Sequence, residues 1–419
     1  MHPYIAVGIG LRERGHSVTI ASSEVYRAKV EGEGLLFHPL RPDLPDLPEA
    51  AGDAEIWRRI MHPRTGSEFV FRKLIMPWLE QNFEATVAAA RDADVLVGHV
   101  IAFATPTVAR HLKKPWISVA LQPSIFLSAL DPPVISGAPY LSPLHTLIPG
   151  FPRLFFGFAR RAMRGWGDPV NELRRRLGLH PLRNPVLDDM FSPWGTQAWF
   201  SRVLAQPQAD WPARTVVTGF PFYDMLEPGQ GLSGELAEFL DAGPAPVVFT
   251  LGSTAVFDAG AFYRESLEAV RKIGCRAVLL IGRDARNRPS GPLPDHVLVA
   301  EYAPYSELLP RAAATVHQGG VGTTAQALRA GRPMIVVPYS HDQPDNGARV
   351  RRLGAGRVIP RRKYRAERVA KELEILLEND AYAEAATRAA REMARENGVC
   401  AACEGLEALI GQRPIAPQC

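Results

Sequence analysis

The feature that most constrains the fold is the alternation of short β-branched segments with longer helical patterns along the whole chain. Segments such as "PVVFTLGS" and "PMIVVP" read as buried strands because they are short, apolar and bounded by turn residues. Alternation of this kind produces parallel sheets with helices on both faces, so we expect an α/β protein built from doubly wound sheets. The expected strands are residues 17–22, 94–98, 115–121, 246–253, 276–282, 296–300, 314–318, 333–338 and 356–360, and the expected helices include 68–91, 101–112, 260–273, 322–330, 343–353, 365–378 and 381–412.

Chain length and the placement of glycine and proline indicate two domains. The 419 residues are too many for one compact core. The segment "LEPGQGLSG", residues 226–234, is rich in glycine and proline and poor in apolar residues, which is typical of a linker. We expect an N-terminal domain over residues 1–225 and a C-terminal domain over residues 235–395. The final segment, residues 396–419, is expected to form a helix that packs back on the N-terminal domain.

Composition excludes several classes of protein. The formal net charge of +4 is small for this length and gives no basis for nucleic-acid binding. No segment has the run of about 18 apolar residues that a membrane span needs, and the N-terminus lacks the pattern of a signal peptide. The four cysteines form no disulfide framework, and Cys400 and Cys403 lie in an apolar-periodic helix, where packing outweighs a redox or metal role. A cytoplasmic location fits this pattern.

The segment "VHQGGVGTTAQAL", residues 316–328, is the strongest indication of a ligand site. Glycines let a backbone approach a ligand that any Cβ would hold away, and the N–H groups and dipole of a new helix favour an anion. A histidine at a strand end and two threonine hydroxyls add hydrogen-bond donors. The pattern predicts a phosphate or diphosphate site, although a tight turn beside a core histidine is the alternative. The residues concerned are His317, Gly319, Gly320, Val321, Gly322, Thr323 and Thr324.

Two further turns are expected at the same edge of the sheet. Asp342 and Gln343 follow the strand "PMIVVP" and place an acceptor beside a donor, which suits the hydroxyls of a sugar. Asp342 could equally cap the helix that begins after it. The turn Gly252-Ser253-Thr254 ends the first strand of the C-terminal domain, and it could close over the same phosphates or be an ordinary tight turn.

Residues 302–350, "YAPYSELLPRAAATVHQGGVGTTAQALRAGRPMIVVPYSHDQPDNGARV", resemble the donor-binding signature of the GT-B glycosyltransferases. These enzymes include plant natural-product glucosyltransferases, sterol glucosyltransferases and macrolide glycosyltransferases. The segments "GHSVTIAS" and "TVVTGFPFYD" resemble the bacterial branch that contains the rhamnosyltransferase of rhamnolipid synthesis, so the resemblance spans nearly the whole chain. It implies two Rossmann-like domains facing across a cleft, and an inverting transfer of a hexose from a UDP- or dTDP-sugar to a hydroxyl. The nucleotide sugar is a co-substrate, and no cofactor is expected.

The resemblance also implies roles for the residues around the glycine loop. His317 corresponds to the histidine that contacts the donor diphosphate, and the backbone of Gly319 to Thr324 corresponds to the phosphate cradle. Asp342 and Gln343 correspond to the pair that holds the sugar hydroxyls, and Ser253 to the serine of the first loop of the donor domain. The leaving diphosphate would be stabilised by these N–H groups without a metal ion, and no Asp-x-Asp metal signature lies at a strand end.

The nucleoside end of the donor is less constrained. Tyr302 lies where many relatives place a tryptophan that stacks on uracil, and Ala303 would offer backbone hydrogen bonds to the base. Gln326 lies where plant members carry a glutamate that binds the ribose. This departure leaves UDP and dTDP both open, because a dTDP donor has no 2′-hydroxyl to bind.

The first residues depart from the branch that the chain resembles. The sequence "MHPYIAVGIG" begins in a helix and the first expected strand comes at residue 17, whereas relatives open with a strand and a glycine-aspartate turn. We expect that strand, and the aspartate that serves as general base, upstream of Met1. The catalytic base within this sequence is therefore unassigned. His2 could take a proton, but the resemblance does not give it that role, and a residue lining the cleft is the simpler interpretation.

The acceptor is expected on the N-terminal domain and is poorly specified. Residues 144–166 are apolar and aromatic, then basic at Arg160, Arg161 and Arg164. They could line a pocket for a hydrophobic hydroxylated acceptor, touch an anionic membrane surface at the inner face, or form an ordinary core helix. His99 and His111 are better explained as structural residues than as catalytic ones.

Two functions from other classes remain as alternatives. The lost first strand would be compatible with a catalytically impaired protein that only binds sugar nucleotides. A sugar-nucleotide 2-epimerase can share this architecture, but it needs acidic and basic groups in the N-terminal half that the sequence does not supply.

Overall fold

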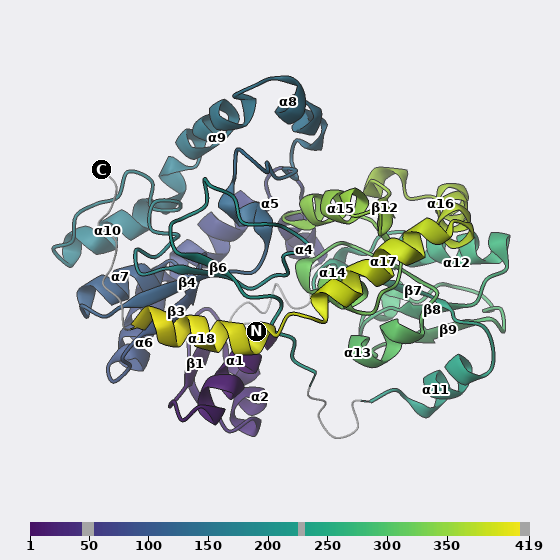
Figure 1. Ribbon diagram of the computed structural model, residues 1–419, viewed down its shortest axis with the longest axis horizontal. Coiled ribbons are helices and arrows are strands. Elements are labelled where there is room, and N and C mark those ends of the chain that lie inside the picture. The colour runs from purple at the N-terminus through teal and green to yellow at the C-terminus, as the bar shows by residue number, and fades with distance from the viewer. Residues whose placement is uncertain (44–53, 225–230, 411–419) are drawn as a thin grey trace.

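The computed structural model describes residues 1–43, 54–224 and 231–410, and it contains two α/β domains side by side (Figure 1). The N-terminal domain carries strands β1 to β6 and the C-terminal domain carries β7 to β12. Most of the expected linker, residues 226–230, lies outside the described residues. None of the described helices is long and apolar enough to cross a lipid bilayer.

The strands of the N-terminal domain form two separate parallel sheets. One sheet pairs β1 with β2, and the other has the order β3-β4-β5-β6. Helices lie around both sheets (Figure 1). The elements are α1 (His2–Glu13), β1 (Thr19–Ser22), α2 (Arg27–Gly32), β2 (Leu36–Pro39), α4 (Ala54–Ile60), α5 (Gly66–Phe69), α6 (Leu79–Ala90), β3 (Leu96–His99), α7 (Ala104–His111), β4 (Trp116–Ala120), α8 (Ser142–Leu147), α9 (Phe151–Ala162), α10 (Asp168–Arg176), β5 (Thr196–Ala198) and β6 (Thr215–Val217).

The C-terminal domain is a doubly wound parallel sheet with the order β12-β11-β10-β7-β8-β9. The chain runs outward from β7 through β9, then returns to the other side of β7 and runs outward again from β10. Ligands of such sheets bind at the carboxyl ends of the strands where the order reverses, here between β7 and β10. The elements are α11 (Gly234–Asp241), β7 (Val247–Thr250), α12 (Phe262–Ile273), β8 (Ala277–Leu280), β9 (Val297–Ala300), α13 (Tyr305–Leu308), β10 (Ala314–His317), α14 (Val321–Arg329), β11 (Met334–Val336), α15 (Gln343–Arg352), β12 (Gly356–Val358), α16 (Ala366–Glu378), α17 (Asp380–Met393) and α18 (Gly398–Ile410).

The nine expected strands are all present, and the differences lie elsewhere. The sequence analysis missed β2, β5 and β6, which have only three or four residues each. The expected helix 68–91 is interrupted by π and 3₁₀ turns up to Trp78, because Pro77 cannot donate a helical hydrogen bond. The single helix expected over 381–412 is wrong, since α17 ends at Met393 and α18 begins at Gly398.

The break before α18 allows the chain to return to the N-terminal domain (Figure 1). A Cβ on Gly398 would lie 2.4 Å from the carbonyl carbon and oxygen of Phe220, so only glycine fits this crossing point. Beyond it, α18 packs on α1, and the Sγ of buried Cys403 lies 3.7 Å from the backbone oxygen of Val7. Cys403 is a free thiol that serves as a core side chain in this contact.

Helix α4 of the N-terminal domain packs into the core of the C-terminal domain. Its neighbour Met61 is 1% exposed and belongs to the C-terminal hydrophobic cluster. Trp57 stacks on Phe257 with ring centroids 4.8 Å apart. Phe257 lies in the turn that follows β7, so an N-terminal helix covers one of the loops at the expected ligand site.

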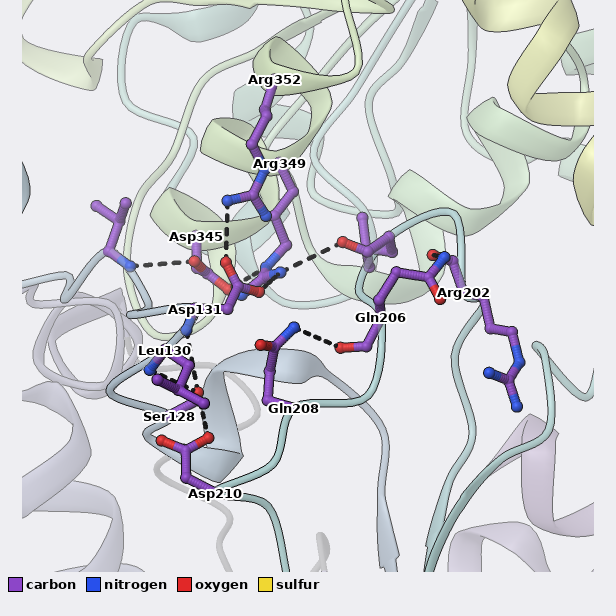
Figure 2. Close-up of polar contacts among 12 residues, drawn as sticks. Ser128, Leu130, Asp131, Arg202, Gln206, Gln208, Asp210, Asp345, Arg349 and Arg352 are labelled. Atoms are coloured by element: carbon purple, nitrogen blue, oxygen red, sulfur yellow. Dashed lines mark hydrogen bonds and ion pairs between the residues drawn. The ribbon is translucent and has the colours of Figure 1, made fainter. Parts of the chain in front are cut away.

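A buried ion cluster joins the domains on another side (Figure 2). Arg349 of α15 donates from Nε to Asp345 at 2.7 Å and from Nη1 to Asp131 of the N-terminal domain at 2.6 Å. Asp345 also accepts a hydrogen bond from the backbone N–H of Val134 at 3.0 Å. Burial acts to raise the pKa of Asp131, but the charge and hydrogen bond of Arg349 hold that pKa below its ordinary value. Exposed Arg352 makes a second ion pair with Asp131 at 2.9 Å.

We predict that Arg349→Ala destabilises the protein by about 3–5 kcal/mol, because buried Asp345 would lose its cationic partner and Asp131 would keep only the exposed Arg352. Arg352→Ala is the matched control: it removes an arginine from the same aspartate, but its side chain is 61% exposed against 3% for Arg349. The control should cost less than about 1 kcal/mol. Denaturant unfolding of both variants measures the difference, and equal losses would contradict the assignment of Arg349 as the buried junction residue.

Candidate active site

Three loops meet at the edge of the C-terminal sheet where its strand order reverses. Thr250 of β7, His317 of β10 and Val336 of β11 are register partners, so the three strands end at one level. The glycine loop follows β10 and is pressed against its neighbours. Gly319 has φ of +88°, and a Cβ there would lie 2.5 Å from Cγ1 of Val336 and 3.1 Å from the backbone oxygen of Gln343. Only glycine fits this position, as the sequence pattern predicts.

His317 is fully buried beneath the loop and shapes it from inside. Its Nδ1 accepts a hydrogen bond from the N–H of Gly319 at 3.0 Å, and its Nε2 lies 3.3 Å from Sδ of Met334. Burial lowers the pKa of His317 to about 3, so the imidazole is neutral and carries its proton on Nε2. The expected direct contact with a phosphate stays a prediction. The observed contacts assign the imidazole to the support of the loop.

The N-terminus of α14 supplies the groups expected to hold an anion. The first helical hydrogen bond runs from Thr324 N–H to the oxygen of Gly320, so the N–H groups of Gly322 and Thr323 have no intrahelical acceptor. Gly322 is exposed, and a Cβ there would meet nothing within 4 Å. The helix dipole adds to this local positive potential. Binding of a phosphate by these N–H groups, which the sequence predicts, stays a prediction.

Asp342 ties the next loop to this helix start. Its Oδ2 accepts hydrogen bonds from the N–H of Val321 at 3.1 Å and from Nδ2 of Asn346 at 2.7 Å. Asp342 is the N-cap residue of α15, but its side chain makes no capping hydrogen bond to that helix. Burial raises the pKa of Asp342 to about 6, and the hydrogen bonds from Asn346 and Val321 oppose the rise.

Asn346 is a site residue that the sequence analysis missed. It is fully buried, and its Nδ2 also donates to the backbone oxygen of Gly319 at 2.8 Å, so one side chain joins both loops. Its spacing of four residues from Asp342 on a helix is the signal that could have identified it. Gln343 also supports the turn: its Oε1 accepts hydrogen bonds from the N–H groups of Tyr339 and Ser340, at 2.8 and 3.1 Å. Because both donors are N–H groups, the Gln343 amide leaves only its NH₂ free to bind a ligand.

The turn after β7 approaches the glycine loop from the other side. Gly252 has φ of +62°, and a Cβ there would lie 2.4 Å from Nε2 of Gln318. Ser253 is exposed at the tip of this turn, where the sequence analysis expects it to meet the donor. Three buried oxygens around the glycine loop, Oε1 of Gln318, Oγ1 of Thr324 and Oδ1 of Asn346, have no hydrogen-bond partner, and such groups are uncommon in folded proteins.

The residues expected to hold the nucleoside lie on the segment between β9 and α13. Tyr302 is 62% exposed, and Ala303 is buried beside it. Tyr305 anchors this segment to the site, since its hydroxyl lies 2.8 Å from Oγ1 of Thr250. Burial raises the pKa of Tyr305, so the phenol is neutral. Gln326 is half-buried on α14.

His341 is a second residue that the sequence analysis missed. It adopts φ of +56°, which is rare outside glycine, immediately before Asp342. Its Nδ1 lies 3.3 Å from the hydroxyl of Ser67 of the N-terminal domain, and Ser340 donates to the backbone oxygen of His62 at 3.3 Å. The turn that carries Asp342 is therefore held partly by the other domain.

His2 makes a ring contact rather than a hydrogen bond of the kind that holds His341. Its ring is stacked with that of Tyr223 at 5.4 Å. Although the residue is exposed as a whole, burial of the ring, together with the charges of Lys29 and the N-terminal amine, lowers the pKa of His2 to about 4. An imidazole with this pKa is a weak base at neutral pH, which favours a packing role over a catalytic one.

Comparison with known proteins identifies the family. Residues 264–409 match the family described as erythromycin biosynthesis protein CIII-like, C-terminal domain. The chain is 34% identical over 425 residues to the O-mycaminosyltylonolide 6-deoxyallosyltransferase of Streptomyces fradiae, covering 99% of this chain and 96% of that protein. It is 27% identical over 425 residues to the sterol 3-beta-glucosyltransferase of Yarrowia lipolytica, covering 97% of this chain but 28% of that protein.

A solved structure shows the same fold. The spinosyn rhamnosyltransferase SpnG, complexed with thymidine diphosphate, aligns with a TM-score of 0.65 at 18% identity and covers 97% of each chain. The agreement of sequence and fold over the full described length leaves one assignment. The chain belongs to the GT-B glycosyltransferase family and is a glycosyltransferase enzyme.

Proposed function

We propose that the enzyme transfers a hexose from a nucleoside diphosphate sugar to a hydroxyl of a lipid or natural-product acceptor. The observation that carries this proposal is the open N-terminus of α14, with the unpaired N–H groups of Gly322 and Thr323, set beside the carboxylate of Asp342. The names of the relatives support both classes of acceptor, since one relative acts on a macrolide and another on a sterol.

The proposed reaction is a direct displacement with inversion at the anomeric carbon. The acceptor hydroxyl forms a new C–O bond as the bond from that carbon to the diphosphate breaks, and the hydroxyl gives up its proton. Negative charge then grows on the leaving diphosphate. The N–H groups at the start of α14 point at that charge and need no reorganisation as it develops, so a metal ion is not required in this scheme.

We propose dTDP as the preferred nucleotide, with UDP as the alternative. Gln326 replaces the acidic residue with which plant relatives hold the ribose 2′-hydroxyl, and dTDP lacks that hydroxyl. The fold neighbour that binds thymidine diphosphate supports the choice. The exposed ring of Tyr302 offers a stacking face to either base.

Release of nucleoside diphosphate from dTDP- and UDP-sugars, with and without candidate macrolide or sterol alcohols, tests the proposal. Release that depends on the alcohol, together with a glycosylated product, is the expected result. A sugar isomer formed without alcohol would indicate an epimerase. Tight nucleotide-sugar binding with no turnover would indicate a binding protein.

We predict that His317→Ala lowers donor affinity and turnover by about ten- to a hundredfold. Two isosteric changes separate the possible causes. Asn places an oxygen near the position of Nδ1 and can accept the Gly319 N–H, whereas Gln places its NH₂ near Nε2. If His317→Asn restores donor affinity, the imidazole acts by holding the glycine loop. If His317→Gln restores it, the imidazole contacts the phosphate. Unchanged affinity for dTDP and UDP by calorimetry in all three variants would exclude both roles.

We predict that Asp342→Asn spares binding of free dTDP or UDP, within about threefold, but lowers turnover of the nucleotide sugar by about ten- to a hundredfold. Asn keeps an oxygen for the N–H of Val321, but it removes the charge and replaces the other carboxylate oxygen, an acceptor for sugar hydroxyls, by an NH₂ group. Calorimetry with the nucleotide and kinetics with the sugar donor measure the two effects. Equal weakening of both would show that Asp342 acts only on the loop.

The raised pKa of Asp342 predicts a pH dependence. Its charged form binds hydroxyls more strongly, so kcat/KM should rise with pH through about 6 and level off above it. His317, with a pKa near 3, should add no transition between pH 5 and 8. The profile of Asp342→Asn should lack the rise near 6. A transition that persists in this variant would belong to another group.

A further inference from the structure

The α8–α9 hairpin is apolar and basic, and it projects from the N-terminal domain (Figure 1). Residues 132–167 contain no aspartate or glutamate, whereas they carry four arginines. The charge of this segment is therefore positive throughout, in a chain whose overall net charge is only +4. The positive residues are Arg153, Arg160, Arg161 and Arg164.

Large apolar side chains on this hairpin point into solvent. Leu154 is 75% exposed and Phe158 is 71% exposed, and they follow each other by one turn on the outer side of α9. Leu147 at the end of α8 is 71% exposed, and Ile148 beside it is 48% exposed. These four residues form an exposed apolar patch, which we call the hairpin patch. The alternative interpretation of residues 144–166, an ordinary core helix with a solvated end, is wrong, because Leu154 and Phe158 are exposed within α9 rather than at its end.

The hairpin patch does not stabilise the hairpin itself. The inner side is held by an aromatic cluster around His145, whose ring lies 5.5 Å from Phe151 and 6.1 Å from Phe156, while Phe151 stacks on Phe155. Pro152 and Phe156 are the buried residues of α9. Since the core side is complete, the outward leucine and phenylalanine need another partner.

The arginines of α9 are carried on the same helix as Leu154 and Phe158 of the hairpin patch. At about 100° per residue, Arg161 falls within about 20° of Leu154 around α9, whereas Arg153 and Arg160 lie about 100–120° from Leu154, on the side away from Phe158. All three are exposed. Long cationic side chains beside an apolar stripe are typical of helices that lie in the interface of an anionic bilayer, with the arginines at headgroup level.

We propose that the hairpin patch docks the enzyme on the surface of an anionic lipid bilayer. Charge selects this occupant over a second copy of the chain, because a symmetric contact would place arginines against arginines. At twelve residues, α9 is too short to cross the bilayer, so it lies on the surface. The proposal concerns attachment only and is independent of the donor site.

Vesicle sedimentation of the full chain tests the proposal, using equimolar phosphatidylcholine and phosphatidylglycerol against phosphatidylcholine alone. Binding should require the anionic lipid and weaken in high salt. Leu154→Ser with Phe158→Ser should lower partitioning at least tenfold. Replacing Arg153, Arg160 and Arg161 together by Gln should lower it by about fivefold per arginine.

Two matched controls keep the test specific. Leu377→Ser removes an exposed leucine of α16, and Arg388→Gln removes an exposed arginine of α17, both in the C-terminal domain. Neither should change partitioning, and thermal melting confirms that each variant is folded. The proposal is overturned if the protein does not bind vesicles, or if the control variants lose as much binding as the patch variants. It is also overturned if the hairpin patch mediates self-association, or captures an acidic protein, without any binding to vesicles. Loss of turnover with a soluble acceptor, again without vesicle binding, would assign the patch to the acceptor site and overturn it as well.

Discussion

The hydrogen bonds of Asn346 and Asp342 hold together the surface on which the site depends. Through them the start of α15 is bonded to Gly319 and Val321, so the loops after β10 and β11 become one unit. Parallel strands bring these loops to one edge, but only side-chain bonds fix their separation. The buried imidazole of His317 completes the arrangement from below. The open N–H groups of α14 are thereby preorganised, which is what stabilisation of a leaving diphosphate requires.

Helix α15 connects this unit to the N-terminal domain. Its first turn carries both Asn346, which is bonded to the glycine loop, and Asp345, which accepts from Val134, while Arg349 in the next turn binds Asp131 (Figure 2). The turn before it is also held by the N-terminal domain, through the contacts of Ser340 and His341. A change in the relative position of the domains would therefore move the residues that we propose bind the donor sugar. Helix α15 thus connects the proposed donor site to the N-terminal domain.

Sequence reasoning identified what depends on local pattern. The strands of the C-terminal sheet, the glycine loop and the Asp342-Gln343 turn each carry their signal within a few residues, and backbone requirements such as the positive φ of Gly319 explain why. Contacts between distant segments left no such signal. The ion pair of Asp131 and Arg349 spans 218 residues, and Gly398 is needed only because Phe220 lies against it. Strands as short as β5 and β6 are defined by their neighbours rather than by their own residues.

Amide hydrogen exchange with and without saturating dTDP tests the central claim most directly, since that claim places the donor diphosphate on the N-terminus of α14. The account predicts that the amides of Gly322 and Thr323 exchange more slowly when the nucleotide is bound, while those of α16 are unchanged. Binding of dTDP, shown by calorimetry on the same sample, with no added protection at residues 319–324 would contradict it.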